Sequence, residues 1–332
     1  MNKELFAEVI AKYGLTPTKR MSMQKGYRNE SYPFVDSTGL AKNLILYKDE
    51  PDVLKLIKLA NRSANFVAKQ GLPARTNADG RILSIKTSTG VRYAALYDYL
   101  PGQTIAWEAY TRDHIKLLGM TLAKVHAGLA LLDASDFPAV ESRLRANLQV
   151  IADYFADKGV QSALATKLAI KVAPDQLKAC LKTLDQIKAL QFSQVLHMDF
   201  VRGNVLFNSQ PAGANQLTVG KVNLTGILDF EKTARGNPIY DLARSLAFLM
   251  VDCKYKTEAK VYKYFIVSGY LKRGGGRLNQ QQISLIDATV NLFLLYDFYK
   301  FLLYNPYQSL PDNEHFVRTK NCLLARKVIT AL

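Results

Sequence analysis

The sequence predicts an α+β protein with two lobes, a small strand-rich lobe followed by a larger, mostly helical one. Short strand patterns bounded by turn residues dominate the first 100 residues, together with one long helix pattern. After Gly102 the apolar residues recur at helical spacing. We therefore expect an N-terminal lobe of residues 1–102 and a C-terminal lobe of residues 103–332.

The strands of the N-terminal lobe are predicted in two pairs. "SYPFV" and "NLILYK" flank a turn at "DSTG", and "RILSIKTSTGVRYAALYDYL" holds two more strands around a Ser-Thr-Gly turn. Between the pairs, residues 49–71 begin with acidic residues and a proline, space apolar residues three and four apart, and end at glycine, which predicts a helix. "MNKELFAEVIAKYG" is predicted to be an amphipathic helix and not a signal peptide, because Glu4 and Glu8 interrupt its apolar run.

The C-terminal lobe is predicted to begin with three helices, at residues 111–132, 140–159 and 173–191. "NVLFN" and "LTGILDF" follow and are expected to form a hairpin with an enlarged turn. Helices broken at "KRGGGR" complete the chain. We expect His126 to be packed in the core and His114 and His315 to lie at the surface.

Composition excludes several classes of protein. Apolar residues make up 48% of the 332 residues and charged residues 22%, unlike disordered chains. The three cysteines form no CxxC pair, so neither a disulfide framework nor a zinc site is indicated. The most apolar stretch, "LFLLYDFYKFLLY", is too short and too charged to span a bilayer. We expect a cytoplasmic protein without a membrane span.

The formal net charge of +16 is the one unusual bulk property. Clustered basic residues would attract nucleic acid, an anionic membrane or an acidic ligand, whereas basic residues spread over solvated helix faces would not. No block of five or six like charges occurs, which favours the second interpretation without excluding nucleic acid as a partner.

Two neighbouring segments carry the residues that point to chemistry. "HMDFVRGNVLF" supplies His197, Asp199 and Asn204, and "GILDFEKTARGNPIYDLA" supplies Asp229, Glu231 and Asp241. An aspartate five residues before an asparagine is the spacing of the catalytic loop of protein kinases, where the aspartate accepts the substrate hydroxyl proton and the asparagine binds magnesium. A further aspartate at the end of an apolar strand would add a carboxylate ligand for the metal. These residue types are also frequent in ordinary turns and caps, but their joint spacing favours phosphoryl transfer.

With these motifs the chain resembles the aminoglycoside phosphotransferase and choline kinase superfamily. The resemblance rests on the two segments above, on "YLPGQT" at the lobe junction and on "LGMTLAKVHAGL" in the helix that follows. It extends from about residue 21 to 250. The resemblance implies a protein-kinase-like two-lobed fold and an enzyme that phosphorylates a hydroxyl group of a small molecule.

The resemblance also implies roles for individual residues. Asp199 would be the catalytic base, and Asn204 and Asp229 would bind Mg2+, with ATP or another nucleoside triphosphate as phosphoryl donor. The backbone from Asp98 to Leu100 would receive the edge of the adenine ring.

Three more residues would support this site. His197 would brace the catalytic loop through backbone hydrogen bonds, and Asp241 would be the structural aspartate that follows the metal-binding strand. Glu231 would either assist the metal or orient the loop.

The phosphate-binding part of the N-terminal lobe matches the family less closely. Gly26, Asn29 and Ser31 resemble its short phosphate-covering turn, without a full GxGxxG motif. The basic residue that pairs with the phosphates aligns with Ile45, and its glutamate partner on the following helix aligns with Asn61. Either Lys48 substitutes for the missing basic residue from a shifted position, or nucleotide binding is altered.

Several functions therefore stay open. The leading hypothesis is an ATP- and Mg2+-dependent kinase of a small hydroxyl compound: an amino alcohol, a sugar, a homoserine-like metabolite or an antibiotic. Only eleven residues separate Asp229 from Asp241 and no APE motif follows, which argues against a protein kinase. The alternatives are a catalytically weak pseudokinase or nucleotide-sensing scaffold, and a basic protein that binds nucleic acid or another polyanion on a kinase-like scaffold. Residues 254–332 carry twelve Lys or Arg and five Asp or Glu, so an acidic pocket for a polycationic antibiotic is not evident.

Overall fold

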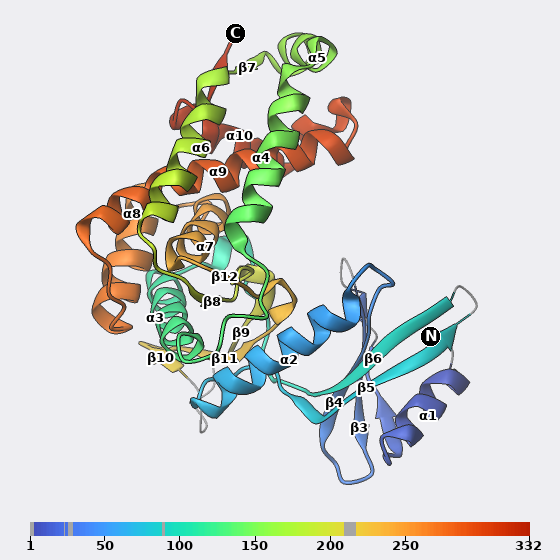
Figure 1. Ribbon diagram of the computed structural model, residues 1–332. Helices are drawn as coiled ribbons and strands as arrows, with labels where there is room; N and C mark the ends of the chain where they lie inside the picture. Colours follow the sequence, from blue (N-terminus) through green and yellow to red (C-terminus); the bar gives the residue numbers. More distant parts are fainter. Residues whose placement is uncertain (1–2, 23, 26–28, 88–89, 209–216) are drawn as a thin grey trace.

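A computed structural model describes residues 3–22, 24–25, 29–87, 90–208 and 217–332. Figure 1 shows a small lobe built on a twisted sheet and a larger lobe of helices. The N-terminus lies in the small lobe and the C-terminus at the far end of the helical lobe. The prediction of an α+β architecture with a strand-rich first lobe and a mostly helical second lobe is confirmed.

The small lobe is an antiparallel sheet with one helix on each face (Figure 1). The sheet order is β1-β3-β4-β6-β5, with β2 also paired to β3. Helix α1 packs on one face and α2 on the other. The elements are α1 (Lys3–Lys12), β1 (Pro17–Arg20), β2 (Gln24–Lys25), β3 (Glu30–Asp36), β4 (Ala41–Leu46), α2 (Val53–Lys69), β5 (Asn77–Thr87) and β6 (Gly90–Asp98).

Side chains on β4 alternate between the two faces of this sheet, because successive residues of a strand point to opposite sides. Leu44 and Leu46 pack with Phe6 and Phe34 under α1, whereas Ile45 and Tyr47 pack with α2. The face that carries odd-numbered residues of β4 is therefore the one that turns toward the helical lobe.

The larger lobe is mostly helical, and its described residues form three small sheets. Its helices are η1 (Trp107–Ala109), α3 (Arg112–Leu129), α4 (Val140–Ala156), α5 (Lys158–Leu168), α6 (Pro174–Ala189), η2 (Arg202–Asn204), η3 (Phe230–Lys232), α7 (Pro238–Asp252), α8 (Glu258–Tyr262), the π-helix η4 (Lys263–Arg273), α9 (Gln280–Tyr304), η5 (Tyr307–Asp312) and α10 (Glu314–Ala325). Its strands are β7 (Ile170–Val172), β8 (Gln194–Leu196), β9 (Val205–Asn208), β10 (Leu217–Val219), β11 (Val222–Ile227), β12 (Ala234–Gly236) and β13 (Ile329–Ala331). No helix in the described part of the chain is both long and apolar enough to cross a membrane.

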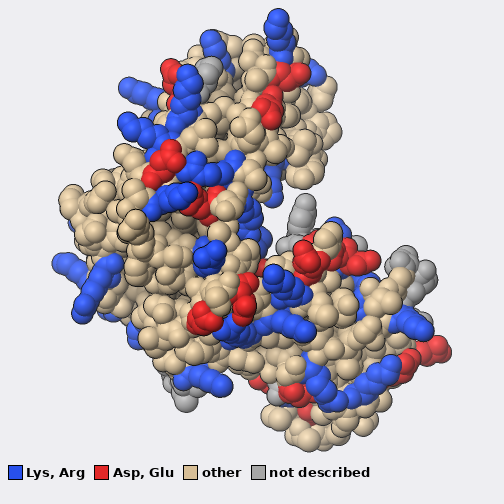
Figure 2. Space-filling view, viewed as in Figure 1, with Lys and Arg blue, Asp and Glu red and all other residues tan. Residues whose placement is uncertain are grey.

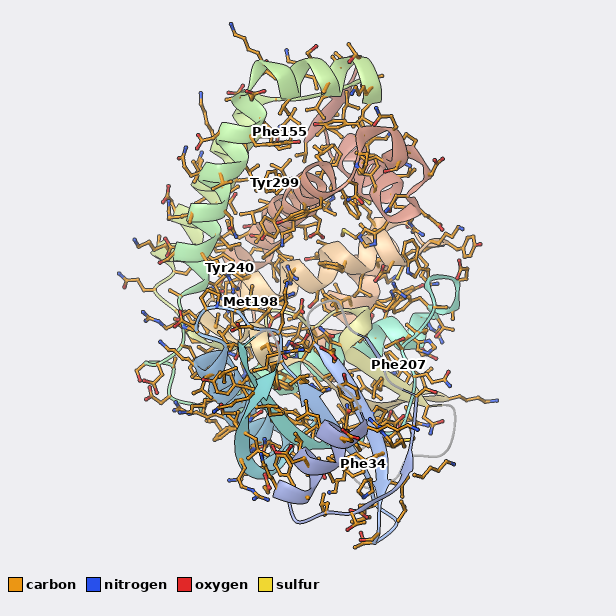
Figure 3. The ribbon with its side chains drawn as sticks, turned by 90° about the vertical axis from the view of Figure 1, so that its right-hand side faces the viewer. Phe34, Phe155, Met198, Phe207, Tyr240 and Tyr299 are labelled. Atoms are coloured by element: carbon orange, nitrogen blue, oxygen red, sulfur yellow. The ribbon has the colours of Figure 1, made fainter. Side chains whose placement is uncertain are left out.

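The predicted hairpin is confirmed, since β9 and β11 pair antiparallel, with β10 on the other side of β11. Figure 3 shows Phe34 in the sheet of the small lobe, Phe155 and Tyr299 toward the far end of the helical lobe, and Met198 between them. The segment "HMDFVRGNVLF" thus lies where the two lobes meet.

Gly102 fixes how closely the lobes approach at this junction. Its φ of +123° disfavours any residue with a side chain. An added Cβ would collide with the Thr225 hydroxyl and lie 2.9 Å from the Phe207 carbonyl oxygen. Next to it, Gln103 and Phe207 exchange two backbone hydrogen bonds of 2.9 Å. The connection therefore packs directly on the β9–β11 hairpin.

Candidate active site

Asp241 in the first turn of α7 shapes the loop that carries Asp199. Its carboxylate accepts hydrogen bonds from the backbone N–H groups of His197 and Met198, at 2.8 and 3.0 Å. Met198 has a φ of +60°, a left-handed conformation that costs energy for a residue with a side chain. The fully buried carboxylate of Asp241 holds the loop in this conformation.

His126 connects Asp241 to the rest of the helical lobe. His126 lies 3.1 Å from Asp241 through Nε2 and 2.9 Å from the Tyr270 hydroxyl through Nδ1, so the prediction that it is a packed core residue is confirmed. Burial raises the pKa of Asp241, but the His126 hydrogen bond and charge, with further groups, lower it by more, so this pKa lies below its usual value.

The His197 ring joins the Asp199 loop to the end of β11. Its Nδ1 accepts the Asp199 N–H at 3.2 Å, which leaves Nε2 to donate to the Leu228 carbonyl at 3.1 Å. Burial lowers the pKa of His197, which keeps the ring neutral. These contacts place His197 as a support for the backbone on both sides of the site.

Asp199 is buried, and two cations hold its carboxylate. Lys232 Nζ lies 2.8 Å from Oδ2, and Arg244 Nη2 lies 2.8 Å from Oδ1. Burial alone would raise the pKa of Asp199, but the charges of Arg244 and Lys232 outweigh it and lower the pKa to about 2. The carboxylate is therefore ionised at any physiological pH.

Asn204 and Asp229 bring oxygen atoms to the cleft that Asp199 also lines. Asn204 donates its side-chain N–H to the Asp199 carbonyl at 2.9 Å and to Oδ2 of that residue at 3.1 Å. Its own Oδ1 accepts no hydrogen bond from the described residues. Asp229, at a φ of +55°, follows β11 and lines the same cleft. One amide oxygen and one carboxylate are the hard donors that magnesium takes from a protein when substrate phosphates and water complete its shell.

These side chains line a cleft of about 640 Å3 between the two lobes. On the small-lobe side Asn29 donates to Glu231 at 2.7 Å, and Ser31 donates to the buried Asn43 at 2.9 Å. The cleft is lined by Asn29, Ser31, Asn43, Ile45, Arg75, Asp98, Tyr99, Leu100, Gly102, Asp199, Val201, Gly203, Asn204, Leu206, Leu228, Asp229, Glu231, Lys232, Arg244 and Phe248.

The junction end of the cleft offers a backbone suited to a planar ring. The Asp98 carboxylate is already engaged by Lys42 at 2.7 Å and Thr76 at 2.8 Å. The N–H and carbonyl of Leu100, in contrast, make no hydrogen bond with any described residue. The backbone of Leu100 is therefore available to a ligand that carries one donor and one acceptor.

The structure does not bring Lys48 to the cleft. Its side chain is 61% exposed, and its ammonium lies 3.9 Å from Glu50. The alternation along β4 explains this placement, because Asn43 and Ile45 face the cleft and the even-numbered positions face away. Gly26 lies outside the described residues.

Arg75, a basic residue between α2 and β5, does line the cleft. Its backbone N–H donates to the Ile227 carbonyl at 3.0 Å, which anchors it beside the end of β11. The guanidinium lies over the Tyr97 ring, 4.9 Å from the centroid. Its Nε is buried without a hydrogen-bond partner among the described residues. Arg75 was not predicted as a site residue, since nothing in the local pattern "LPART" marks it.

Lys232 and Arg244 were not predicted as site residues either. Arg244 follows Asp241 by three residues on α7, so the two share a helix face, and this spacing was a usable signal. The prediction that His114 and His315 are surface residues is wrong. Both are half-buried: His114 packs against Phe207, and His315 packs against Trp107, with burial lowering its pKa to about 4.

Comparison with known proteins identifies the family of the chain. A model of the phosphotransferase enzyme family matches residues 22–255, which is more than half of the chain. No protein with a curated description matches the chain.

Solved structures of small-molecule kinases share the fold at low sequence identity, which confirms the prediction of a kinase-like architecture. A microcompartment-associated aminopropanol kinase superposes with a TM-score of 0.67 at 14% identity, over 98% of this chain and 97% of that one. An amicoumacin kinase solved with AMP-PNP and Ca2+ gives 0.65 at 14% identity, over 98% and 96%. A macrolide 2'-phosphotransferase from Brachybacterium faecium gives 0.60 at 16% identity, over 95% of each chain.

Proposed function

We propose that this chain, which belongs to the phosphotransferase enzyme family, transfers the terminal phosphoryl group of ATP to a hydroxyl group of a small molecule. The transfer would require Mg2+. The observation that carries this proposal is the ionised Asp199 carboxylate, which lies in one cleft with Asn204 and Asp229. The amicoumacin kinase, solved with AMP-PNP and Ca2+, supports a nucleotide donor and a divalent cation.

Asp199 orients the acceptor and takes its proton. The hydroxyl donates to the carboxylate, its oxygen forms a bond to the terminal phosphorus, and the bond from that phosphorus to the bridging oxygen breaks to release ADP. The hydroxyl proton ends on Asp199. A carboxylate with a pKa of about 2 is a weak base, so the proton moves late, when the oxygen–phosphorus bond has formed. Orientation is then its larger contribution, as expected for a loose transition state.

Asn204 and Asp229 would hold the magnesium ion, which would supply charge neutralisation at the phosphates. The Asn204 amide is fixed by its two hydrogen bonds to Asp199, so its oxygen faces the cleft in one orientation. Glu231 is held by Asn29 and keeps the segment after Asp229 against the small lobe.

Arg75 takes the place of the absent basic residue on β4. It lines the cleft, is anchored at Ile227 beside the metal ligand Asp229, and keeps a buried N–H without a partner among described residues. The Leu100 backbone receives the adenine edge. With these two assignments the chain can bind a nucleotide even though Ile45 stands where the family has a basic residue.

The acceptor is a small hydroxyl compound. The similar folds are named for aminopropanol, amicoumacin and macrolide substrates, so the fold accepts amino alcohols and antibiotics of very different size.

Replacing Asp199 with Asn tests the proposal, because the substitution keeps the shape and removes the charge and the proton acceptor. We expect turnover of the acceptor to fall about 10²–10⁴-fold, with ATP binding retained in a calorimetric titration. Asp185→Asn, on the exposed surface of α6, is the matched control for loss of one carboxylate. Wild-type turnover by the Asp199→Asn enzyme would show that the base is misassigned.

A further inference from the structure

The acceptor side of Asp199 carries an excess of positive charge. Lys232 and Arg244 contact its carboxylate directly. Arg143 of α4 and Lys300 of α9 lie close enough to act on the charged groups of the same cluster. Among the described residues, three carboxylates act on these four bases, those of Asp199, Asp241 and Asp297, so the cluster has a net charge of 4 − 3 = +1 even with all three acids ionised. Burial raises the pKa of Asp297 to about 6, which makes the excess larger at lower pH.

The two inner cations are held in place with donors to spare. Arg244 lies over the rings of Phe248 and Phe293, at 5.2 and 5.9 Å from their centroids, and its buried Nε has no partner among the described residues. Lys232 has three N–H donors, of which one points to Asp199, and its side chain is 36% exposed in the cleft. Figure 2 shows basic side chains on the wall of the hollow between the lobes.

We propose that the acceptor is an anionic hydroxy compound, whose carboxylate or phosphate group is bound by Lys232 and Arg244 while its hydroxyl faces Asp199. This inference rests on the proposed phosphotransferase function and names the substrate class of the same site. Arginine and lysine bind carboxylate and phosphate oxygens through short charge-assisted hydrogen bonds. A polycationic acceptor would meet repulsion from the net positive cluster.

The contacts limit the size of the acceptor. The hydroxyl, Asp199, a cation and the anionic group form a chain of three hydrogen bonds of about 2.8 Å each. Where one Asp199 oxygen and one cation nitrogen serve both contacts, the hydroxyl oxygen and the anionic oxygen lie at most about 8 Å apart, and closer where the chain bends. Compounds with the two groups separated by a few carbon atoms fit this limit.

A competing role for the same cations is to neutralise the phosphoryl group in flight, which would serve every acceptor equally. The two roles differ in what happens to acceptor preference when a cation is removed. A cation that binds the acceptor's anion contributes to kcat/KM for an anionic acceptor and little for its neutral analogue, whereas one that serves the phosphoryl group contributes to both.

The test measures kcat/KM for matched acceptors with wild-type enzyme and Mg-ATP. Glycerate is compared with glyceramide, and glycerol phosphate with glycerol, so the two pairs separate carboxylate from phosphate recognition; ethanolamine is the cationic acceptor. We expect at least a tenfold preference for the anionic member of one pair. Lys232→Met should reduce that preference at least fivefold, and Lys232→Arg should retain most of it. Lys178→Met, on the exposed surface of α6, is the control for loss of one positive charge and should leave the preference unchanged.

Two results would overturn the inference while leaving phosphotransfer intact: equal or better use of the neutral or cationic acceptors, or an equal loss for both members of a pair in Lys232→Met. Absence of turnover together with absence of saturable calorimetric binding of both anionic probes, in the presence of AMP-PNP and Mg2+, would also overturn it. Failure of the proposed function is distinguishable, because the wild-type enzyme would then bind no Mg-ATP and phosphorylate no member of the panel.

Discussion

At the scale of single residues, the site is a balance between desolvation and charge. Asp199 is 5% exposed, and an unpaired carboxylate in that position would take up a proton. Arg244 and Lys232 reverse this tendency and keep it ionised. His197 is neutral for the opposite reason, because its burial outweighs the acidic groups nearby. Each group thus has the protonation state that its role in the loop requires.

Arg75 and Lys48 give a direct comparison at this scale, since both are basic residues of the small lobe and only Arg75 lines the cleft. Loss of a charged hydrogen-bond donor to phosphate costs about 1.5–3 kcal/mol. We therefore expect Arg75→Met to weaken Mg-ATP binding about tenfold or more and Lys48→Met to leave it unchanged, as measured by calorimetry. The reverse order would return the phosphate contact to Lys48 and refute the assignment of Arg75.

At the scale of elements, local patterns in the sequence were sufficient for part of the fold. The β3–β4 and β5–β6 pairs, the long helix between them and the β9–β11 pairing all follow from alternation, helical spacing and turn residues. Helix α5, the π-helix η4 and strand β10 were not predicted. Helix η4 packs tightly on α3, where a Cβ on Gly269 would lie 2.6 Å from the Lys116 carbonyl oxygen. Such packing depends on a partner helix about 150 residues away, and no local pattern specifies it.

The candidate site likewise contains residues that the sequence predicts and residues that only the tertiary structure reveals. Asp199, Asn204 and Asp229 lie within one short stretch with a recognisable spacing, so the sequence predicts them together. Arg75 reaches the cleft because the chain after α2 hydrogen-bonds to the end of β11, which is a contact between distant segments. Its position therefore emerges only with the tertiary structure.

Gly102 at the lobe junction supplies a test of how elements position the site. Gly102→Ala forces a Cβ against Thr225 and Phe207, and overpacking of this kind costs about 1–3 kcal/mol. We expect reduced stability in urea unfolding and weaker nucleotide binding, because the Leu100 backbone shifts with the junction. Gly39→Ala is the control: it also has a positive φ, of +81°, but its Cβ would meet nothing within 4 Å. Equal effects of the two substitutions on nucleotide binding would contradict the role given to the junction.

At the scale of the whole molecule, the net charge of +16 needs an explanation beyond the cleft. Figure 2 shows Lys and Arg side chains scattered over both lobes of the visible face, with Asp and Glu among them, and no continuous basic stripe. Binding to nucleic acid draws on many phosphate contacts along such a stripe. The family assignment gives the protein an enzymatic function that does not need a polyanion partner.

We therefore expect no saturable binding of a 20-nucleotide single-stranded RNA at about 150 mM salt, measured by fluorescence anisotropy, since unclustered charges are largely screened there. Serum albumin at equal concentration gives the baseline for nonspecific signal. Submicromolar affinity that falls steeply with added salt would instead support a polyanion-binding role.

The central claim is that this cleft moves a phosphoryl group from ATP to a hydroxyl oxygen. Phosphorus NMR of the purified protein with ATP, Mg2+ and the panel of hydroxy compounds tests it most directly. The predicted result is a new phosphate monoester signal that grows in step with ADP, requires Mg2+ and grows at least about 100-fold more slowly with the Asp199→Asn enzyme. ADP accumulating only with inorganic phosphate, or an ester signal of unchanged rate in Asp199→Asn, would contradict it.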